Sequence, residues 1–171
     1  MKPYLIALLC LFVYSGVAKF YKEEEFTQSL QTWNNLKPAN YKYTVVLFLR
    51  DNIGRTTLKV KNGKVIERSY KETTLFHVPG EFVNAWTEKC ASVGTHTGVL
   101  DYYDIVPAVT LDEVYAYCRD QVLTQDQDPA DEEFSQVVFE TDDKGLIANC
   151  VFYPAFCFDC AWSVYVENIE F

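Results

Sequence analysis

The sequence has few of the residues and motifs on which hydrolytic enzymes depend. Only two histidines, His77 and His96, occur in its 171 residues. Neither lies in a His-Glu-x-x-His metal motif, and no Gly-x-Ser-x-Gly elbow offers a nucleophile that a histidine could activate. No Asn-x-Ser/Thr sequence occurs either, so N-glycosylation is not expected to mask any surface. We therefore expect a protein that is not an enzyme, with both histidines as ordinary loop residues.

Long apolar runs are absent after the first residues. The stretch from Met1 to Ala18 carries one lysine, then an apolar run, then the small residues Gly16 and Ala18. This order is typical of a secretory signal peptide that is cleaved after Ala18. The run is shorter than the about 20 apolar residues that a membrane span needs. We expect a secreted, extracellular protein that does not span a membrane, with residues 19–171 as a single domain.

Basic residues are scarce in the second half of the chain. Residues 19–100 contain 12 basic and 8 acidic side chains, whereas residues 101–171 contain 2 basic and 16 acidic ones. This negative charge repels phosphates, which argues against nucleic acid as a partner. Carboxylates attract hard cations such as calcium, but Ala130 and Asp131 occupy ligand and glycine positions of an EF-hand loop. The alternatives are a solvated acidic face or weak calcium or mineral binding through Asp126, Asp128, Asp131, Glu132 and Glu133.

The cysteine count is odd once the signal peptide, which contains Cys10, is removed. In an oxidising compartment the remaining five are disulfide candidates. Any of the five could be the unpaired one, and the other four can pair in three ways. The unpaired thiol is either buried and inert or joins a second chain in a disulfide-linked dimer. The candidates are Cys90, Cys118, Cys150, Cys157 and Cys160.

The Cys157-Phe-Asp-Cys160 spacing also occurs in redox pairs and zinc sites. A thioredoxin-like pair needs its first thiolate at a helix N-terminus, which lowers the thiol pKa. This pair instead lies between Pro154 and an expected strand. A structural zinc site needs a fourth ligand at matched spacing, and only the two histidines could help to supply one. A structural disulfide is therefore the favoured interpretation.

Hydrophobic periodicity predicts two amphipathic helices. Phe26, Leu30 and Trp33 follow helical spacing between Lys22 and Leu36. The capping box Thr110-Leu-Asp-Glu113 opens a second helix that runs to about Leu123.

Alternating apolar and polar residues predict antiparallel strands. We expect a strand at 41–50, a hairpin that turns at Asn62-Gly63, and three strands between 134 and 171. In the last strand Val164, Val166 and Asn168 should share one face. The predicted fold is α+β, a twisted antiparallel sheet that packs on the two helices and is stabilised by disulfides.

Residues 71–109 contain several turn signals and no long periodic segment. We expect a loop-rich insertion there, with one short helix from Glu81 to Lys89.

Several short motifs follow one another along the chain: Trp33, Asn40-Tyr-Lys-Tyr43, Val60-Lys-Asn-Gly-Lys-Val65, Thr110-Leu-Asp-Glu-Val114 and Asp142-Asp-Lys-Gly-Leu-Ile147. In this layout the chain resembles a bacterial family of small exported domains of unknown function, the one numbered 6174. The family often has a Cys-x-Cys pair where this chain has Leu47-Phe-Leu, and it lacks the cysteines found here between 150 and 160. The resemblance implies a curved antiparallel sheet packed on helices, and it implies no activity.

The functional expectation is a secreted, acidic, non-enzymatic protein of the extracellular matrix or of a surface, without a cofactor. Its acidic half would meet cations, a mineral surface or a basic partner protein. One alternative is an inhibitor or toxin-like effector that docks on a target protein through residues 71–109 and exposed aromatic residues in Asp101-Tyr-Tyr-Asp104 and Phe152-Tyr-Pro-Ala-Phe156. Another is a thiol enzyme of unrecognised type.

Overall fold

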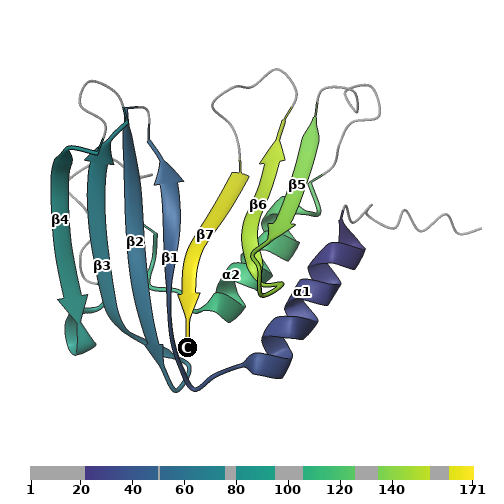
Figure 1. Cartoon of the computed structure of the whole chain (residues 1–171), viewed down its shortest axis with the longest axis horizontal. Coiled ribbons are helices and arrows are strands. Elements are labelled where there is room, and N and C mark those ends of the chain that lie inside the picture. Colours follow the sequence, from purple (N-terminus) through teal and green to yellow (C-terminus); the bar gives the residue numbers. More distant parts are fainter. Residues whose placement is uncertain (1–21, 50, 76–79, 95–105, 126–134, 155–161) are drawn as a thin grey trace, which may run out of the picture.

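One antiparallel sheet of seven strands, accompanied by two α-helices, makes up most of the structure (Figure 1). This computed structural model describes residues 22–49, 51–75, 80–94, 106–125, 135–154 and 162–171. The prediction of an α+β fold is confirmed. The elements are α1 (Glu23–Leu36), β1 (Asn40–Phe48), β2 (Asn52–Lys61), β3 (Lys64–Thr74), β4 (Phe82–Lys89), η1 (Cys90–Ser92), α2 (Leu111–Tyr117), η2 (Cys118–Val122), β5 (Gln136–Thr141), β6 (Ile147–Tyr153) and β7 (Trp162–Glu170).

The strand order β4-β3-β2-β1-β7-β6-β5 joins two meanders side by side. The first and last strands of the chain, β1 and β7, pair at the centre, and β4 and β5 form the two edges (Figure 1). The predicted turns are confirmed. Asn62 and Gly63 have φ values of 51° and 72°, and Gly145 has a φ of 76°. Asparagine and glycine tolerate this left-handed backbone, so local chemistry decides where these hairpins turn.

Both helices pack on one face of the sheet, which we call the inner face. Phe26 of α1 makes edge contacts with Phe139 of β5 and Tyr115 of α2, with ring centroids 5.6 and 5.9 Å apart. Trp33 of α1 makes a similar contact with Tyr41 of β1 at 5.0 Å. These rings belong to one apolar core between the helices and the strands. Its burial from water is the main force that holds the two layers together.

The capping box at the start of α2 is present as predicted. The Glu113 N–H donates to Thr110 Oγ1 at 3.4 Å, and the Thr110 N–H donates to Glu113 Oε2 at 2.7 Å. These bonds satisfy N–H groups that a helix start otherwise leaves unpaired. The α-helix ends at Tyr117 and continues as the π-helical turn η2, so the helical segment reaches about the predicted end.

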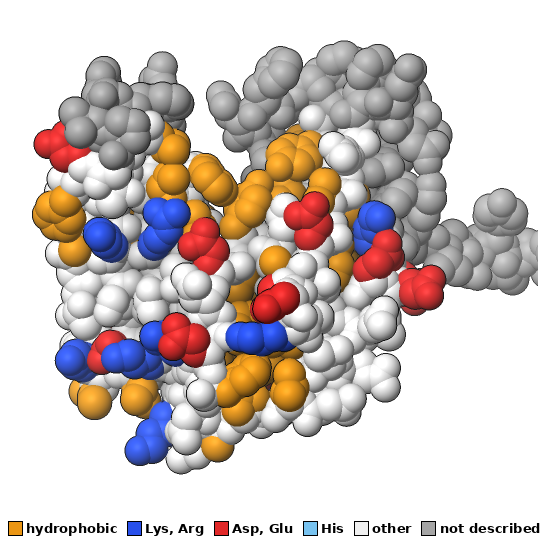
Figure 2. Space-filling model, in the orientation of Figure 1, with side chains coloured by type: hydrophobic (Ala, Val, Ile, Leu, Met, Phe, Trp, Pro, Cys, Tyr) orange, Lys and Arg blue, Asp and Glu red, His pale blue; other side chains and the backbone are white. Residues whose placement is uncertain are grey.

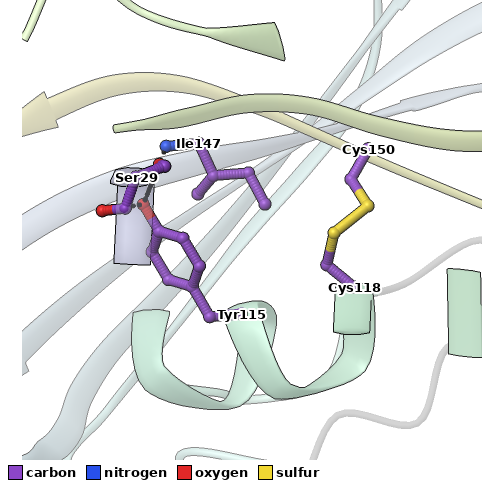
Figure 3. The surroundings of a disulfide bond; sticks show 5 residues. All are labelled: Ser29, Tyr115, Cys118, Ile147 and Cys150. Atoms are coloured by element: carbon purple, nitrogen blue, oxygen red, sulfur yellow. Dashed lines mark hydrogen bonds between the residues drawn. A yellow bond between two sulfur atoms is a disulfide. The ribbon is translucent and has the colours of Figure 1, made fainter. Parts of the chain in front are cut away.

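A disulfide and a buried tyrosine attach α2 and η2 to the rest of the core (Figure 3). Cys118 of η2 bonds to Cys150 of β6, and both residues are fully buried. Nearby, the Tyr115 hydroxyl lies 2.8 Å from Ser29 Oγ and accepts a hydrogen bond from the Ile147 N–H at 2.9 Å (Figure 3). The expectation of a disulfide is confirmed for this pair. Cys90 is free and exposed.

The prediction of a short helix from Glu81 to Lys89 is wrong, because this segment forms the edge strand β4. β4 pairs with β3 from Glu67/Lys89 to Thr73/Phe82. Pairing with β3 satisfies the backbone of one side of β4, and its alternate side chains fit a pleated surface. The region expected to be a loop-rich insertion therefore contributes a strand to the sheet.

The predicted face of the last strand is correct only up to Val166. Asn168 has a φ of 55°, and the β1–β7 register shifts between Lys42 and Thr44. The shift adds a residue to β7, as a β-bulge does, so the alternation of faces changes at this point. As a result Ile169 is buried, whereas Asn168 is exposed.

Among the helices in the described ranges, none is long and apolar enough to cross a membrane.

Candidate functional site

The two central strands are paired along only part of their length. The pairing of β1 with β7 extends from Lys42, opposite Glu170, to Val46, opposite Tyr165, and ends there. Beyond Val46, β1 continues beside β2, and β7 begins beside β6. The two strands consequently diverge at this end of the sheet (Figure 1). In the space-filling view the same place is a notch with apolar side chains along its sides (Figure 2).

An apolar pocket of about 260 Å³ lies where these strands diverge. It is bounded by β1, β7, α2 and the segment that precedes α2. Most of the described lining is aliphatic, and three of its residues carry a polar side chain, namely Glu113, Tyr117 and Ser163. The apolar lining consists of Val45, Leu47, Val106, Pro107, Val109, Val114 and Val164.

The wall before α2 is fixed by hydrogen bonds to side chains of the sheet. The Tyr43 hydroxyl donates to the Val109 carbonyl at 2.6 Å. Arg68 Nη1 donates to the Val106 carbonyl at 3.1 Å. Because both donors come from buried residues of the inner face, this wall is part of the folded core and the pocket is formed in advance of any ligand.

The polar groups of the pocket come mainly from one side of α2. Glu113 and Tyr117 are four residues apart, so they lie one turn from each other on the same face of the helix. Tyr117 is 39 % exposed, and its hydroxyl makes no hydrogen bond with the residues that the structure describes. Partial burial raises the pKa of the Tyr117 hydroxyl, so it remains a protonated donor at neutral pH. Among the described lining residues, the site therefore combines apolar walls with one carboxylate and two hydroxyls, those of Tyr117 and Ser163.

An exposed aromatic strip, formed by Phe48, Tyr153 and Tyr165, lies on the opposite, outer face of the sheet. Phe48 and Tyr165 make an edge contact at 5.0 Å, and the Tyr153 and Tyr165 hydroxyls lie 3.0 Å apart. Burial and the hydrogen bond with Tyr153 raise the pKa of Tyr165 to about 12. Phe48 and Tyr153 are 59 % and 40 % exposed. Rings of this kind, apolar but with a polar tip, are common in protein interfaces.

The structure describes only some of the aromatic residues that the sequence predicts to be exposed. Tyr153 belongs to the exposed strip, whereas its neighbour Phe152 is buried. Residues 101–104, 155 and 156 lie outside the described ranges. Sequence reasoning missed Phe48 and Tyr165, because both are single residues on strands that are far apart in the chain.

The predicted calcium ligands lie outside the described residues: Asp126, Asp128, Asp131, Glu132 and Glu133. The same holds for His77, His96, Cys157 and Cys160. Within the described ranges, no group of three or more histidine, cysteine, aspartate or glutamate side chains could hold a metal ion. Calcium binding and the role of the Cys-x-x-Cys pair therefore stay predictions.

The pocket was also missed at the sequence level. The spacing of Thr110 and Glu113 predicts a capping box, but it does not indicate that Glu113 lines a pocket. The site depends on where β1 and β7 stop pairing, and that depends on the register of two strands from opposite ends of the chain.

No family model matches this chain, and no curated protein or solved structure matches it either. The resemblance to the family numbered 6174 therefore stays a prediction, and the candidate site has to be judged by its own geometry.

Proposed function

We propose that this protein is a secreted, non-enzymatic binding protein that holds one small, largely apolar molecule in the pocket between β1, β7 and α2. The observation that carries this proposal is a preformed apolar pocket of about 260 Å³ at the end of the β1–β7 ladder. An apolar cavity of about 150 Å³ is large enough for benzene. By proportion, this pocket suits a molecule of about ten non-hydrogen atoms.

The expected affinity is moderate. A ligand of this size has few atoms with which to gain binding energy, and it pays for lost translational freedom. At about 0.6 kcal/mol per non-hydrogen atom, within the range known for small ligands, ten atoms give a Kd on the order of 10–100 µM. Fixed walls favour binding because little ordering of the protein accompanies it.

Binding of indole, an uncharged probe of suitable size, tests the proposal. Titration followed by ligand-observed NMR should give saturable binding with one site. Leu47→Trp places a large side chain in the lining and should weaken binding more than about tenfold. Val83→Phe is the control, because Val83 lies exposed on the edge strand β4, away from the pocket. If indole fails to bind the wild-type protein, or binds Leu47→Trp equally well, the pocket is not a ligand site.

A second candidate is docking on a target protein, which is favoured by the exposed aromatic strip. Phe48 and Tyr153 present large apolar area on the outer face, where none of the described helices packs. The double variant Phe48→Ser, Tyr153→Ser should lose a stoichiometric protein partner that Leu47→Trp retains. Retention of the partner by the double variant would exclude this surface.

The matrix or mineral-binding proposal makes a different prediction. Adsorption to a calcium mineral should depend on calcium and should be lost when the five acidic residues between 126 and 133 are neutralised. Unchanged adsorption in the presence of a chelator would contradict it.

A further inference from the structure

The charge in the pocket is of one sign. Glu113 is the acidic residue in the lining, and none of the lining residues that the structure describes is basic. Glu113 is exposed, so water and salt screen part of this charge, and its effect on a ligand is that of a surface charge at the mouth of an apolar pocket. A ligand with a negative end group would meet repulsion there, whereas a positive end group would be attracted.

One oxygen of the Glu113 carboxylate is available to a ligand. Oε2 accepts hydrogen bonds from the Thr110 N–H at 2.7 Å and from the Thr110 hydroxyl at 2.8 Å. With the residues that the structure describes, Oε1 makes no hydrogen bond and Glu113 forms no ion pair. The capping box therefore fixes the carboxylate in position and leaves half of its acceptor capacity unused.

Tyr117 adds two further means of recognition on the same side of α2. Its hydroxyl can donate or accept one hydrogen bond, and its ring offers a π-face to a cation. Because Tyr117 follows Glu113 by one helical turn, the ring and the carboxylate flank the same part of the pocket.

We infer that the pocket selects apolar molecules that carry a protonated amine or another cationic end group, which binds to the Glu113 carboxylate beside Tyr117, and that it discriminates against carboxylates. This inference rests on the proposed function, because it names the chemical class of the ligand in the same pocket.

Three probes of nearly equal size and shape separate the possibilities: benzylamine, benzyl alcohol and benzoate. Their dissociation constants should be measured by ligand-observed NMR at low salt and near neutral pH. We expect benzylamine to bind about threefold more tightly than benzyl alcohol, since a charge-assisted hydrogen bond is stronger than a neutral one, although the exposure of Glu113 limits the gain. Benzoate should bind more weakly than benzyl alcohol by a similar factor.

Two matched variants assign the effect to Glu113. Glu113→Gln removes the charge but keeps an acceptor for the capping box, so α2 should still form. It should remove the preference, so that benzylamine and benzyl alcohol bind with about equal affinity, with benzyl alcohol affinity unchanged. Asp112→Asn removes the same charge from the adjacent residue, whose Oδ1 binds Trp33 Nε1 and Lys37 Nζ and is not in the pocket lining. It should leave the preference intact.

The outcomes distinguish this inference from the proposed function. If benzyl alcohol binds, Leu47→Trp abolishes its binding and benzylamine has no advantage, then the pocket binds ligands but the end-group inference is wrong. Equal loss of preference in Glu113→Gln and Asp112→Asn would also overturn it, because the net charge of the protein would then be the cause. If none of the three probes binds, both proposals are wrong.

Discussion

The inner face of the sheet is packed in two different ways on its two sides. Under α1 and α2 the buried residues of the strands are mainly apolar, such as Val45, Phe139 and Cys150. On β3 two of the three buried residues, Arg68 and Glu72, are instead charged, and the third, Tyr70, donates a hydrogen bond to Glu72 at 3.3 Å. The stability of the first, apolar side depends on the apolar area that is removed from water. The stability of the second, polar side depends on each buried polar group having a hydrogen-bond or ion-pair partner.

The partners on the polar side are well defined. Arg68 is 3 % exposed, and its Nε and Nη2 lie 2.9 and 2.8 Å from Glu88 Oε2. Its guanidinium also lies 5.0 Å from the centre of the Trp86 ring. The Gly94 N–H donates to the same Glu88 oxygen at 2.8 Å. A buried charge that loses its ion-pair partner lowers the free energy of unfolding by several kcal/mol. We therefore expect single substitutions to destabilise the protein more on this polar side than on the apolar side.

The largest effect is expected from Arg68→Met. It leaves Glu88 buried without its ion-pair partner and should lower the free energy of unfolding by about 3–5 kcal/mol. The double variant Arg68→Met, Glu88→Leu should recover most of this loss, because it removes both charges. Urea unfolding measures both.

The control for this experiment is Lys59→Met on the neighbouring strand. The Lys59 and Glu67 side chains form an ion pair at 2.6 Å, but Lys59 is exposed. Loss of this surface pair should cost less than about 1 kcal/mol. Equal losses in Lys59→Met and Arg68→Met, or no recovery in the double variant, would mean that the two sides do not differ as proposed.

On the apolar side, a large effect is expected from loss of the Cys118–Cys150 disulfide. The double variant Cys118→Ala, Cys150→Ala opens a loop with a sequence separation of 32 residues. A loop of this length corresponds to about 3.7 kcal/mol of stabilisation, mainly through the unfolded state. Thermal unfolding should show this loss, and a reductant should destabilise the wild type more than the variant. Cys90→Ala is the control, because Cys90 is exposed and free; a comparable loss there would point to another pairing.

The features that could be predicted from the sequence are those that a few neighbouring residues determine. Asn62-Gly63 specifies its turn, and Thr110 with Glu113 specifies the start of α2, whatever the rest of the chain does. β4 was missed because its position depends on β3 and on the Arg68–Glu88 pair, which no local pattern indicates. The partner of Cys118 could not be chosen for the same reason, since cysteine spacing carries no information about the register of β6.

The candidate site was the least predictable part. Its aliphatic residues have the alternation of ordinary core positions, so their sequence does not distinguish a filled core from a pocket. The pocket exists because β1 and β7 stop pairing at Val46 and Tyr165. The register of the same ladder also shifts at its other end, near Asn168, where an asparagine rather than a glycine takes the left-handed backbone.

High pH should weaken the apolar side through its buried tyrosines. Burial raises the pKa of Tyr41, Tyr43 and Tyr115 above the ordinary value of 10.0. The unfolded chain then loses these protons at a lower pH than the folded protein does. Stability should be fully present below pH 10 and should fall as the pH rises from 10 through the folded-state values. A set of urea unfolding curves between about pH 8 and 11.5 measures the slope.

Tyr43→Phe tests the origin of this slope. The variant loses the hydrogen bond to the Val109 carbonyl, so it should be less stable at neutral pH by about 1 kcal/mol. It should nevertheless lose less stability than the wild type between neutral and alkaline pH, because one titrating group is gone. An unchanged slope would show that other groups cause the alkaline effect.

The smallest effect is expected at Thr56, which breaks the rule that polar groups on the polar side have partners. Its Oγ1 is buried and has no hydrogen-bond partner among the described residues. Thr56 is paired across the sheet with Tyr70 of β3, so it lies within the polar side. Thr56→Val replaces the hydroxyl with a methyl group of similar size and should raise the free energy of unfolding by about 1 kcal/mol.

Thr44→Val provides the matched comparison on β1. The Thr44 hydroxyl lies 2.9 Å from Thr57 Oγ1, so its removal should cost about 1 kcal/mol instead of giving a gain. Urea unfolding measures both changes in the free energy of unfolding. If they have opposite signs, a buried hydroxyl in this sheet stabilises the protein only when it has a hydrogen-bond partner. If Thr56→Val destabilises the protein as Thr44→Val does, the Thr56 hydroxyl has a partner, and the polar side is fully satisfied.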